Sequence, residues 1–286
     1  MTLEAPMRCS ALAEQLGEAV AGTVEQRVRW LLVEDHSAWG SEAVADVIGP
    51  DAAATAKSLA LRVQLVRRRE GPPEAGAPRR LTLIDTETRT MATRQIVSPA
   101  EIDAEAAASA AVEEFGEPVS GPIFLVCTNG KRDACCALRG RALMTELSAV
   151  EPESVWETTH LGGHRFAANL VCLPHGIVYG RVSPGDGPRL ADAYRAGRLD
   201  TALLRGRSAW PAPAQVAEVE LRTSLGLGGV DDLRLLAVHA DGDEATVKFE
   251  VEGATHRLAM RSERGEPRPT SCRGDKLESP IHWRLA

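Results

Sequence analysis

The sequence predicts an α/β protein that consists of two α/β units and a smaller α+β region at the C-terminal end. Short apolar runs alternate with helix-like segments through most of the chain, which is typical of α/β folds. The 286 residues are enough for two domains and an appendage. We therefore expect an N-terminal unit at residues 1–115, a second unit at 116–207 and a C-terminal extension at 208–286.

In the first unit, RVRWLLV at residues 27–33 predicts a buried strand. The segments SEAVADVIG and DAAATAKSLALR, which follow it, predict two helices. RVQLVRRR and RRLTLIDTE then have the apolar patterns of strands. The Ala- and Glu-rich residues 101–114 are typical of a helix that leads into the second unit.

The second unit begins with the apolar run GPIFLV, which leads into the cysteine loop CTNGKRDAC. We expect a helix over residues 136–150, a strand at VWETTH, two strands joined by the turn Pro174-His175-Gly176, and a helix at RLADAYRAGR. This order, with cysteines where the first strand enters its helix, is the thioredoxin layout. The first unit has a loosely similar order without the cysteine loop, so we expect two thioredoxin-like units.

The C-terminal extension is expected to contain one helix and a small set of strands. PAQVAEVELRTSLG predicts the helix, and its Gly-rich end indicates a C-terminal cap. LRLLAVHA, ATVKFEVE and THRLAMRS predict alternating strands. The last residues, from about 264, are expected to be mostly irregular.

Composition narrows the class of protein. The formal net charge of −7 argues against nucleic acid as the main partner, because phosphate binding needs a basic face. The sequence contains no run of roughly 18 to 20 apolar residues that would predict a membrane span. MTLEAPMRCSALAEQ lacks the pattern of a secretory signal, so we expect a cytoplasmic protein. In that reducing compartment six cysteines indicate metal binding or redox chemistry rather than a disulfide framework.

Four side chains form the candidate site: Cys127 and Cys136 in the first loop, and His160 and His164 in HLGGH. Two adjacent glycines separate the histidines, and each would cost about 1 kcal/mol inside a helix. We therefore expect a tight loop that directs both imidazoles at one centre. A zincin-type metalloprotease is excluded, because Leu161 stands where its catalytic glutamate would be.

Two thiolates and two imidazoles form a complete set of four ligands. On chemistry alone they suit a tetrahedral Zn²⁺ ion, or a [2Fe–2S] cluster with two cysteines on one iron and two histidines on the other. The spacing matches neither a Rieske centre, in which each pair contains one Cys and one His, nor a zinc knuckle. The residues themselves leave both metals open.

The stretches CTNGKRDACCALRG and WETTHLGGHRFAANLVCLPHGIVYGRV resemble the sucrase/ferredoxin-like family, thioredoxin-fold [2Fe–2S] proteins, in its bis-histidinyl, non-Rieske branch. RCSALAEQLGEAVAGTVEQRVRWLLVE and RPTSCRGDKLE are similar to the terminal segments of that family. The resemblance implies a [2Fe–2S] cluster bound by Cys127, Cys136, His160 and His164. Cys135 is adjacent to Cys136 and could also be the second ligand, but Cys-Ala-Leu-Arg-Gly from Cys136 onward matches the family pattern.

This ligand set has consequences for the redox potential. Two ferric ions, two sulfides, two thiolates and two neutral imidazoles have no net charge, so reduction should be easier than with four thiolates. An imidazole N–H can also titrate, which predicts proton-coupled reduction. Nearby cations are expected to raise the potential further; the sequence places four of them close to the cysteines, namely Lys131, Arg132, Arg139 and Arg141.

The leading functional hypothesis is therefore electron transfer or redox sensing, in an electron carrier more than an enzyme, with an unidentified reductase or acceptor protein as partner. One alternative is a metal-independent thiol oxidoreductase, although the chain lacks a C-x-x-C at the helix start. Another is a structural zinc module that binds partner proteins. Cys172 is expected to be a buried apolar residue, and Cys9 and Cys272 receive no assigned role.

Overall fold

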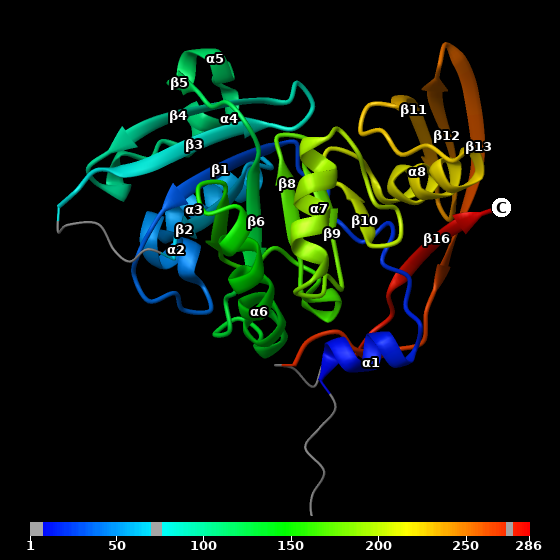
Figure 1. Cartoon of the computed structure of the whole chain (residues 1–286), viewed down its shortest axis with the longest axis horizontal. Coiled ribbons are helices and arrows are strands. Elements are labelled where there is room, and N and C mark those ends of the chain that lie inside the picture. The colour runs from blue at the N-terminus through cyan, green and yellow to red at the C-terminus, as the bar shows by residue number, and fades with distance from the viewer. Residues whose placement is uncertain (1–7, 70–75, 273–276) are drawn as a thin grey trace, which may run out of the picture.

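The computed structural model describes residues 8–69, 76–272 and 277–286. It has a mixed α/β architecture: a ten-stranded mixed sheet flanked by helices, and a four-stranded antiparallel sheet formed by the C-terminal part of the chain (Figure 1). Among the described helices, none combines the length and apolar character needed to cross a membrane.

The first half of the large sheet contains four strands in the order β2-β1-β3-β4, and a fifth, β5, at the edge beside β4. β1 pairs in parallel with β2 and antiparallel with β3, and β3 pairs antiparallel with β4. The strands are β1 (Arg29–Glu34), β2 (Arg62–Arg67), β3 (Arg79–Asp85), β4 (Thr90–Ile96) and the short edge strand β5 (Glu117–Pro118). The helices are α1 (Cys9–Gln15), α2 (Ala43–Ile48), α3 (Pro50–Ser58), η1 (Pro99–Glu101), α4 (Ala104–Ser109) and α5 (Val112–Phe115).

The second half repeats this arrangement with the order β7-β6-β8-β9. β6 pairs in parallel with β7 and antiparallel with β8, which pairs antiparallel with β9. Its elements are β6 (Ile123–Cys127), α6 (Ala134–Val150), β7 (Val155–Thr158), η2 (His164–Phe166), β8 (Leu170–Leu173), β9 (Ile177–Tyr179), α7 (Asp186–Arg195) and β10 (Leu204–Arg207). The sequence predicted a loose similarity between the two halves, and in the structure their strand orders are identical.

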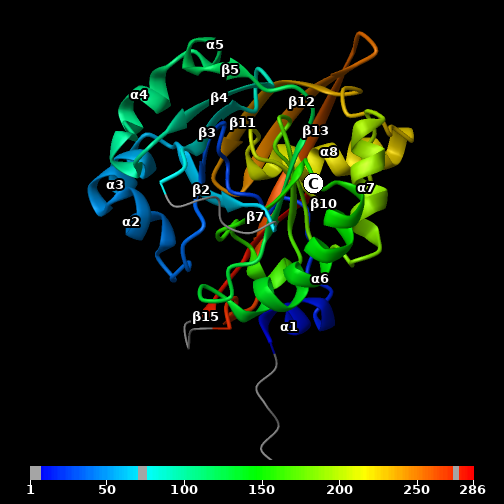
Figure 2. The ribbon, with the colours of Figure 1, turned by 60° about the vertical axis from the view of Figure 1, so that its left-hand side comes forward.

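A short antiparallel ladder between β2 and β7 joins the two halves into one sheet. Val66 pairs with Thr158, and Arg67 pairs with Glu157. Figure 2 shows α2 to α5 gathered beside the first half and α6 and α7 beside the second. Alternate residues of the strands face opposite sides, so Leu31 and Val33 of β1 pack in the helix-covered core of the first half, whereas Trp30 and Leu32 join a cluster on the other face that both halves share.

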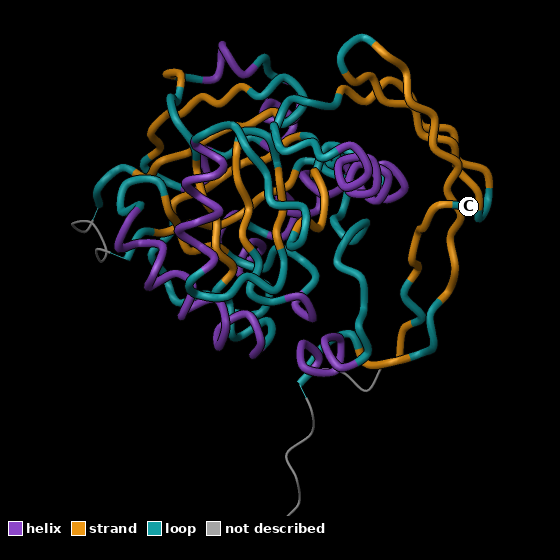
Figure 3. Tube along the Cα trace, turned by 45° about the vertical axis from the view of Figure 1, so that its right-hand side comes forward, coloured by secondary structure: helices purple, strands orange, loops and turns teal. Residues whose placement is uncertain are grey.

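The C-terminal part forms the separate sheet seen beside the main body in Figure 3. Helix α8 (Ala212–Leu225) lies between the two sheets and contacts β10 on one side and β12, β13 and β16 on the other. Gly226 ends this helix in the left-handed conformation, as the sequence predicted. The strands of this sheet are β11 (Arg234–Asp241), β12 (Glu244–Val251), β13 (Ala254–Arg264) and β16 (Ile281–Leu285). The short strands β14 (Arg268–Pro269) and β15 (Leu277–Glu278) pair with each other in a separate two-stranded sheet.

Several elements differ from the sequence prediction, among them β10 and α1, which were not predicted. The continuous helix expected at residues 101–114 is interrupted at Ala110 and Ala111, whose backbones are extended. Asp103 caps a new helix start by accepting a hydrogen bond from the Ala106 N–H, and the Arg29 guanidinium donates to the Ala110 carbonyl at the break. The tail is also less irregular than expected, because β16 adds to the edge of β13.

Candidate metal centre

The two predicted cysteine ligands lie where β6 meets α6. Cys127 is the last residue of β6 and Cys136 is the third residue of α6, and both side chains are buried. Asp133 fixes the start of the helix, because its carboxylate accepts a hydrogen bond from the Cys135 N–H at 2.9 Å. The strand end and the helix start thus bring two thiols together although eight residues separate them in the sequence.

The segment from His160 to His164 forms a tight loop, as the sequence predicted. It follows β7, and Gly162 and Gly163 adopt φ values of +82° and +66°, in the left-handed region that favours glycine. A Cβ atom on Gly163 would also lie 2.2 Å from Nη2 of Arg205. His160 precedes this glycine pair and His164 follows it, so the reversal of the backbone places both rings on one side.

Three of the four predicted residues converge directly. The ligand atoms of Cys127, Cys136 and His160 all lie within 4.8 Å of one another, and Nδ1 of His160 is 4.0 Å from Sγ of Cys136. His164 lies beside this group rather than in it: its Nδ1 is 3.3 Å from Nε2 of His160. The structure therefore places the two thiols together and the two imidazoles together, with His160 between the thiols and His164.

The far side of the His164 ring faces protein groups. Its Nε2 lies 3.8 Å from Oδ2 of Asp133, and the Thr270 backbone also interacts with the ring. Burial lowers the pKa of His164, an effect that the Asp133 carboxylate partly opposes. A neutral imidazole held by outer partners in this way is the form that binds a metal.

The electrostatic environment favours a thiolate at Cys127. Hydrogen bonds from the Cys136 thiol and the His160 ring, together with the charge of His160, lower the pKa of Cys127 well below its ordinary value, although burial acts in the opposite direction. Two cations, Arg62 and Arg205, also interact with the Cys127 charge. Arg205 is so deeply buried that desolvation lowers its pKa to about 9.

Hydrogen bonds from both halves of the sheet hold the histidine loop. Gln64 of β2 donates to the His160 carbonyl at 3.3 Å and accepts hydrogen bonds from the hydroxyls of Thr158 and Thr159. Arg205 donates to the Gly162 carbonyl and to Oδ1 of Asn169. The sequence prediction missed both supports; Gln64 gave a signal as a polar residue within the apolar run RVQLVRRR, whereas no strand was predicted around Arg205.

The four cations expected around the cysteines lie mostly at the surface. Arg132 forms an ion pair with Glu42, and Arg139 forms one with Glu14. Lys131 and Arg141 are exposed. The partly buried Arg62 and the buried Arg205 therefore influence this site more than these exposed cations, because water screens exposed charges.

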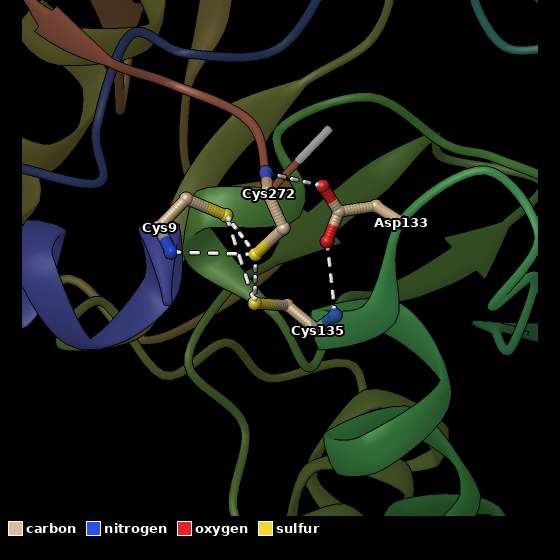
Figure 4. Close-up of side chains that lie close together, drawn as sticks. All are labelled: Cys9, Asp133, Cys135 and Cys272. Atoms are coloured by element: carbon tan, nitrogen blue, oxygen red, sulfur yellow. Dashed lines mark hydrogen bonds between the residues drawn. The ribbon is translucent and has the colours of Figure 1, made fainter. Parts of the chain in front are cut away.

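The adjacent cysteines belong to two different groups. Cys136 faces Cys127 and His160, whereas Cys135 faces Cys9 and Cys272, with Asp133 beside them (Figure 4). The structure thus separates the two candidates for the second ligand. Cys172 is buried in β8, outside both groups.

The histidine side of the centre is its open side. A surface cavity of about 340 Å³ borders His160. His160 and His164 are half-buried, whereas the two cysteines are 1 % exposed. Residues from both halves of the sheet line the cavity, among them Arg62, Gln64, Asn129 and Arg132.

Comparison with known proteins gives a family and two relatives. The model of the sucrase/ferredoxin-like family matches residues 20–206. The chain is 32% identical over 90 residues to "Altered inheritance of mitochondria protein 32" of Meyerozyma guilliermondii, which covers 28% of this chain and 32% of that protein. It is 30% identical over 107 residues to the protein of the same name from Eremothecium gossypii, 32% of this chain and 34% of that protein. The chain thus matches about a third of the length of these relatives, and no solved structure matches it.

Proposed function

Because the chain belongs to the sucrase/ferredoxin-like family, we propose that it holds a [2Fe–2S] cluster at Cys127, Cys136, His160 and His164 and acts in electron transfer or redox sensing. The convergence of Cys127, Cys136 and His160, with His164 adjacent, is the observation that carries this proposal. Two neighbouring thiols and two neighbouring imidazoles fit a cluster with cysteines on one iron and histidines on the other. When bound, such a cluster accepts and donates one electron.

The assignment of two thioredoxin-like units is part of the same proposal. We propose that residues 1–115 and 116–207 are two thioredoxin-like units, with 208–286 as an extension. The shared strand order, with a parallel β-α-β pair followed by two antiparallel strands, supports it. Membership in a ferredoxin-like family is consistent with this assignment, in which the site lies where the first strand of the second unit enters its helix.

The solvent exposure of the four proposed ligands determines how such a centre would exchange electrons. The two cysteines are buried in the core. A redox partner would therefore reach the centre through the half-buried His160 and His164 and the cavity that borders His160. We propose that an unidentified reductase or acceptor protein docks there, in the cytoplasm. The partly buried Arg62 and the buried Arg205 would stabilise the additional negative charge of the reduced state.

Protons are expected to follow the electron. His164 would help to hold the cluster, and the Nε2 side of its ring faces Asp133 and Thr270, which could hold a proton there. Reduction makes the imidazole ligands more basic, so the midpoint potential should fall as pH rises. A potential that is constant between about pH 6 and 9 would contradict this part of the proposal.

Analysis of iron and acid-labile sulfide, with the visible spectrum before and after dithionite, tests the main proposal. We expect two irons and two sulfides per chain and a coloured protein that bleaches on reduction. His160→Ala and His164→Ala should lose the cluster and the colour. His239→Ala is the matched control, because His239 is exposed on β11 and should leave both unchanged.

Two other results would replace the proposal with the alternatives. A colourless protein with zinc at these four residues would indicate a structural zinc module. A metal-free protein whose Cys127 and Cys136 thiols titrate and turn over would indicate a thiol oxidoreductase. Iron and sulfide contents unaffected by the two histidine variants would also remove the assignment of the ligands.

A further inference from the structure

Three cysteines form a second group close to the proposed cluster, and the proposed function does not use them. Cys9 comes from α1, Cys135 from the start of α6, and Cys272 from the segment before β15. Their sulfur atoms lie 3.6 Å (Cys9–Cys135), 3.2 Å (Cys135–Cys272) and 3.4 Å (Cys9–Cys272) apart. Figure 4 shows the three side chains directed toward one point. Cys9 and Cys272, which are 263 residues apart in the sequence, thus lie side by side.

A buried carboxylate completes the group. The ligand atoms of Asp133 and the three cysteines all lie within 4.8 Å of one another, and the Asp133 side chain is fully buried. Its orientation is fixed: one oxygen accepts from the Cys135 N–H, and the other accepts from the Cys272 N–H at 3.0 Å and from the Ser271 hydroxyl at 3.2 Å. The Cys9 N–H in turn lies 3.4 Å from the Cys272 sulfur and donates to it. Such outer hydrogen bonds are typical of metal ligands.

We propose that Cys9, Cys135 and Cys272 bind one Zn²⁺ ion, with the Asp133 carboxylate as the fourth ligand. Three thiolates and one carboxylate are ligands that zinc accepts in a tetrahedral site. Magnesium and calcium are excluded, because they require sets of oxygen ligands.

The spacing of the sulfurs supports tetrahedral coordination. With Zn–S bonds of about 2.3 Å, sulfurs in a tetrahedral site lie about 3.8 Å apart. The observed separations of 3.2 to 3.6 Å are slightly shorter, so an ion at bonding distance would lie outside the plane of the three sulfurs. That position leaves room for a fourth ligand, and Asp133 is available to fill it. A disulfide would instead join two sulfurs and leave the third apart, which the three similar separations do not favour.

The ion would fasten both terminal segments over the proposed cluster. Thr270, whose backbone interacts with the His164 ring, is two residues from Cys272. Asp133 contacts both groups, because it bonds to the Cys272 N–H and lies 3.8 Å from His164. Zinc at this site would therefore keep the C-terminal segment against the histidine side of the neighbouring centre.

Metal analysis of the full-length protein, produced with zinc and iron in the growth medium, tests the site. We expect one zinc per chain in the wild type, and at least a fivefold loss of zinc in Cys9→Ser and Cys272→Ser with iron retained. Cys172→Ser is the matched control, because Cys172 is buried outside both groups and its replacement should leave zinc unchanged. His160→Ala should lose iron and keep zinc, so failure of either proposal is distinguishable from failure of the other.

X-ray absorption at the zinc edge of the wild-type protein gives a test that needs no variant. We expect three sulfur neighbours at about 2.3 Å and one oxygen at about 2.0 Å. A zinc-free wild type, a shell of nitrogen and oxygen only, or zinc retained in both serine variants would overturn the proposal. A disulfide between any two of the three cysteines, found by mass spectrometry of the untreated protein, would also overturn it.

Discussion

Gly140 of α6 lies directly against the backbone carbonyl of Cys127, and a Cβ atom at Gly140 would be 2.0 Å from that oxygen. The helix that carries Cys136 can therefore approach the strand that carries Cys127 only because residue 140 has no side chain. This contact sets the separation of the two thiols, because it determines how closely α6 approaches the end of β6.

Gly140→Ala should push α6 away from β6 and separate the thiols. Overpacking of this kind costs about 1–3 kcal/mol of unfolding free energy, and we expect the iron content to fall with it. Chemical denaturation and iron analysis measure both effects. Gly185→Ala is the control, because a Cβ there meets no atom within 4 Å. Equal iron content and stability in the two variants would refute the role of this contact.

Arg205→Met should make the midpoint potential more negative, because it removes a buried positive charge that interacts with Cys127 and Cys136. It also removes the hydrogen bond to Asn169, at a cost of about 1–3 kcal/mol in stability. Potentiometric titration and denaturation report the two effects separately. Arg141→Met, an exposed substitution on α6, should change neither quantity. An unchanged potential in Arg205→Met would show that its charge does not act on the centre.

Glu218→Gln should destabilise the attachment of the C-terminal sheet. The buried Glu218 of α8 pairs with Arg207 at 2.9 Å and with Arg222 at 3.0 Å. Neutralising the carboxylate leaves the buried Arg207 guanidinium without its counterion and Arg222 with only the more distant Asp232, at 3.9 Å. Breaking a buried ion pair in this way typically costs about 3–5 kcal/mol. Thermal unfolding measures the loss. Glu220→Gln, on the exposed side of the same helix, should be nearly neutral, and similar losses in both variants would argue against the ion pairs as the cause.

The stability of the protein should depend on His175 below neutral pH. Burial, reinforced by the positive charges of Arg207 and Arg89, lowers the pKa of His175 to about 4. An unfolded histidine has a pKa near 6.5, so the unfolded chain binds more protons between about pH 6.5 and 4. Stability therefore falls as pH falls through this window, by at most about 3 kcal/mol from this group, and the contribution is constant above it.

His175→Gln should remove this part of the pH dependence. Denaturation of the wild type and the variant at several pH values between 4 and 7.5 gives the difference in slope. Parallel stability curves over the whole range would show that His175 titrates alike in the folded and unfolded states.

The local features of the site could be predicted from sequence because neighbouring residues determine them. A strand ending at Cys127, a helix containing Cys136 and a glycine loop between His160 and His164 each follow from short patterns, and the structure contains all three. The relation of His164 to Asp133 and Thr270 could not be predicted, because it depends on how the C-terminal segment folds back.

Contacts between distant segments account for what the sequence analysis missed. Cys9 and Cys272 are 263 residues apart, and neither has a local motif that indicates a partner. Gln64 appeared as an ordinary polar residue within the strand pattern RVQLVRRR, and no element was predicted around Arg205; only the assembled sheet shows that both residues support the histidine loop. The seven-residue helix α1 is also too short for a periodic signal.

The ladder between β2 and β7 limits how far the chain of this protein can be shortened. A fragment of residues 116–207 would expose the outer edge of β7, whose free N–H and C=O groups are a template for pairing with a second chain. It would also lose Gln64, which holds the carbonyl of His160. Such a fragment should self-associate and bind iron poorly, so a minimal version of the redox centre has to retain the strands that precede it.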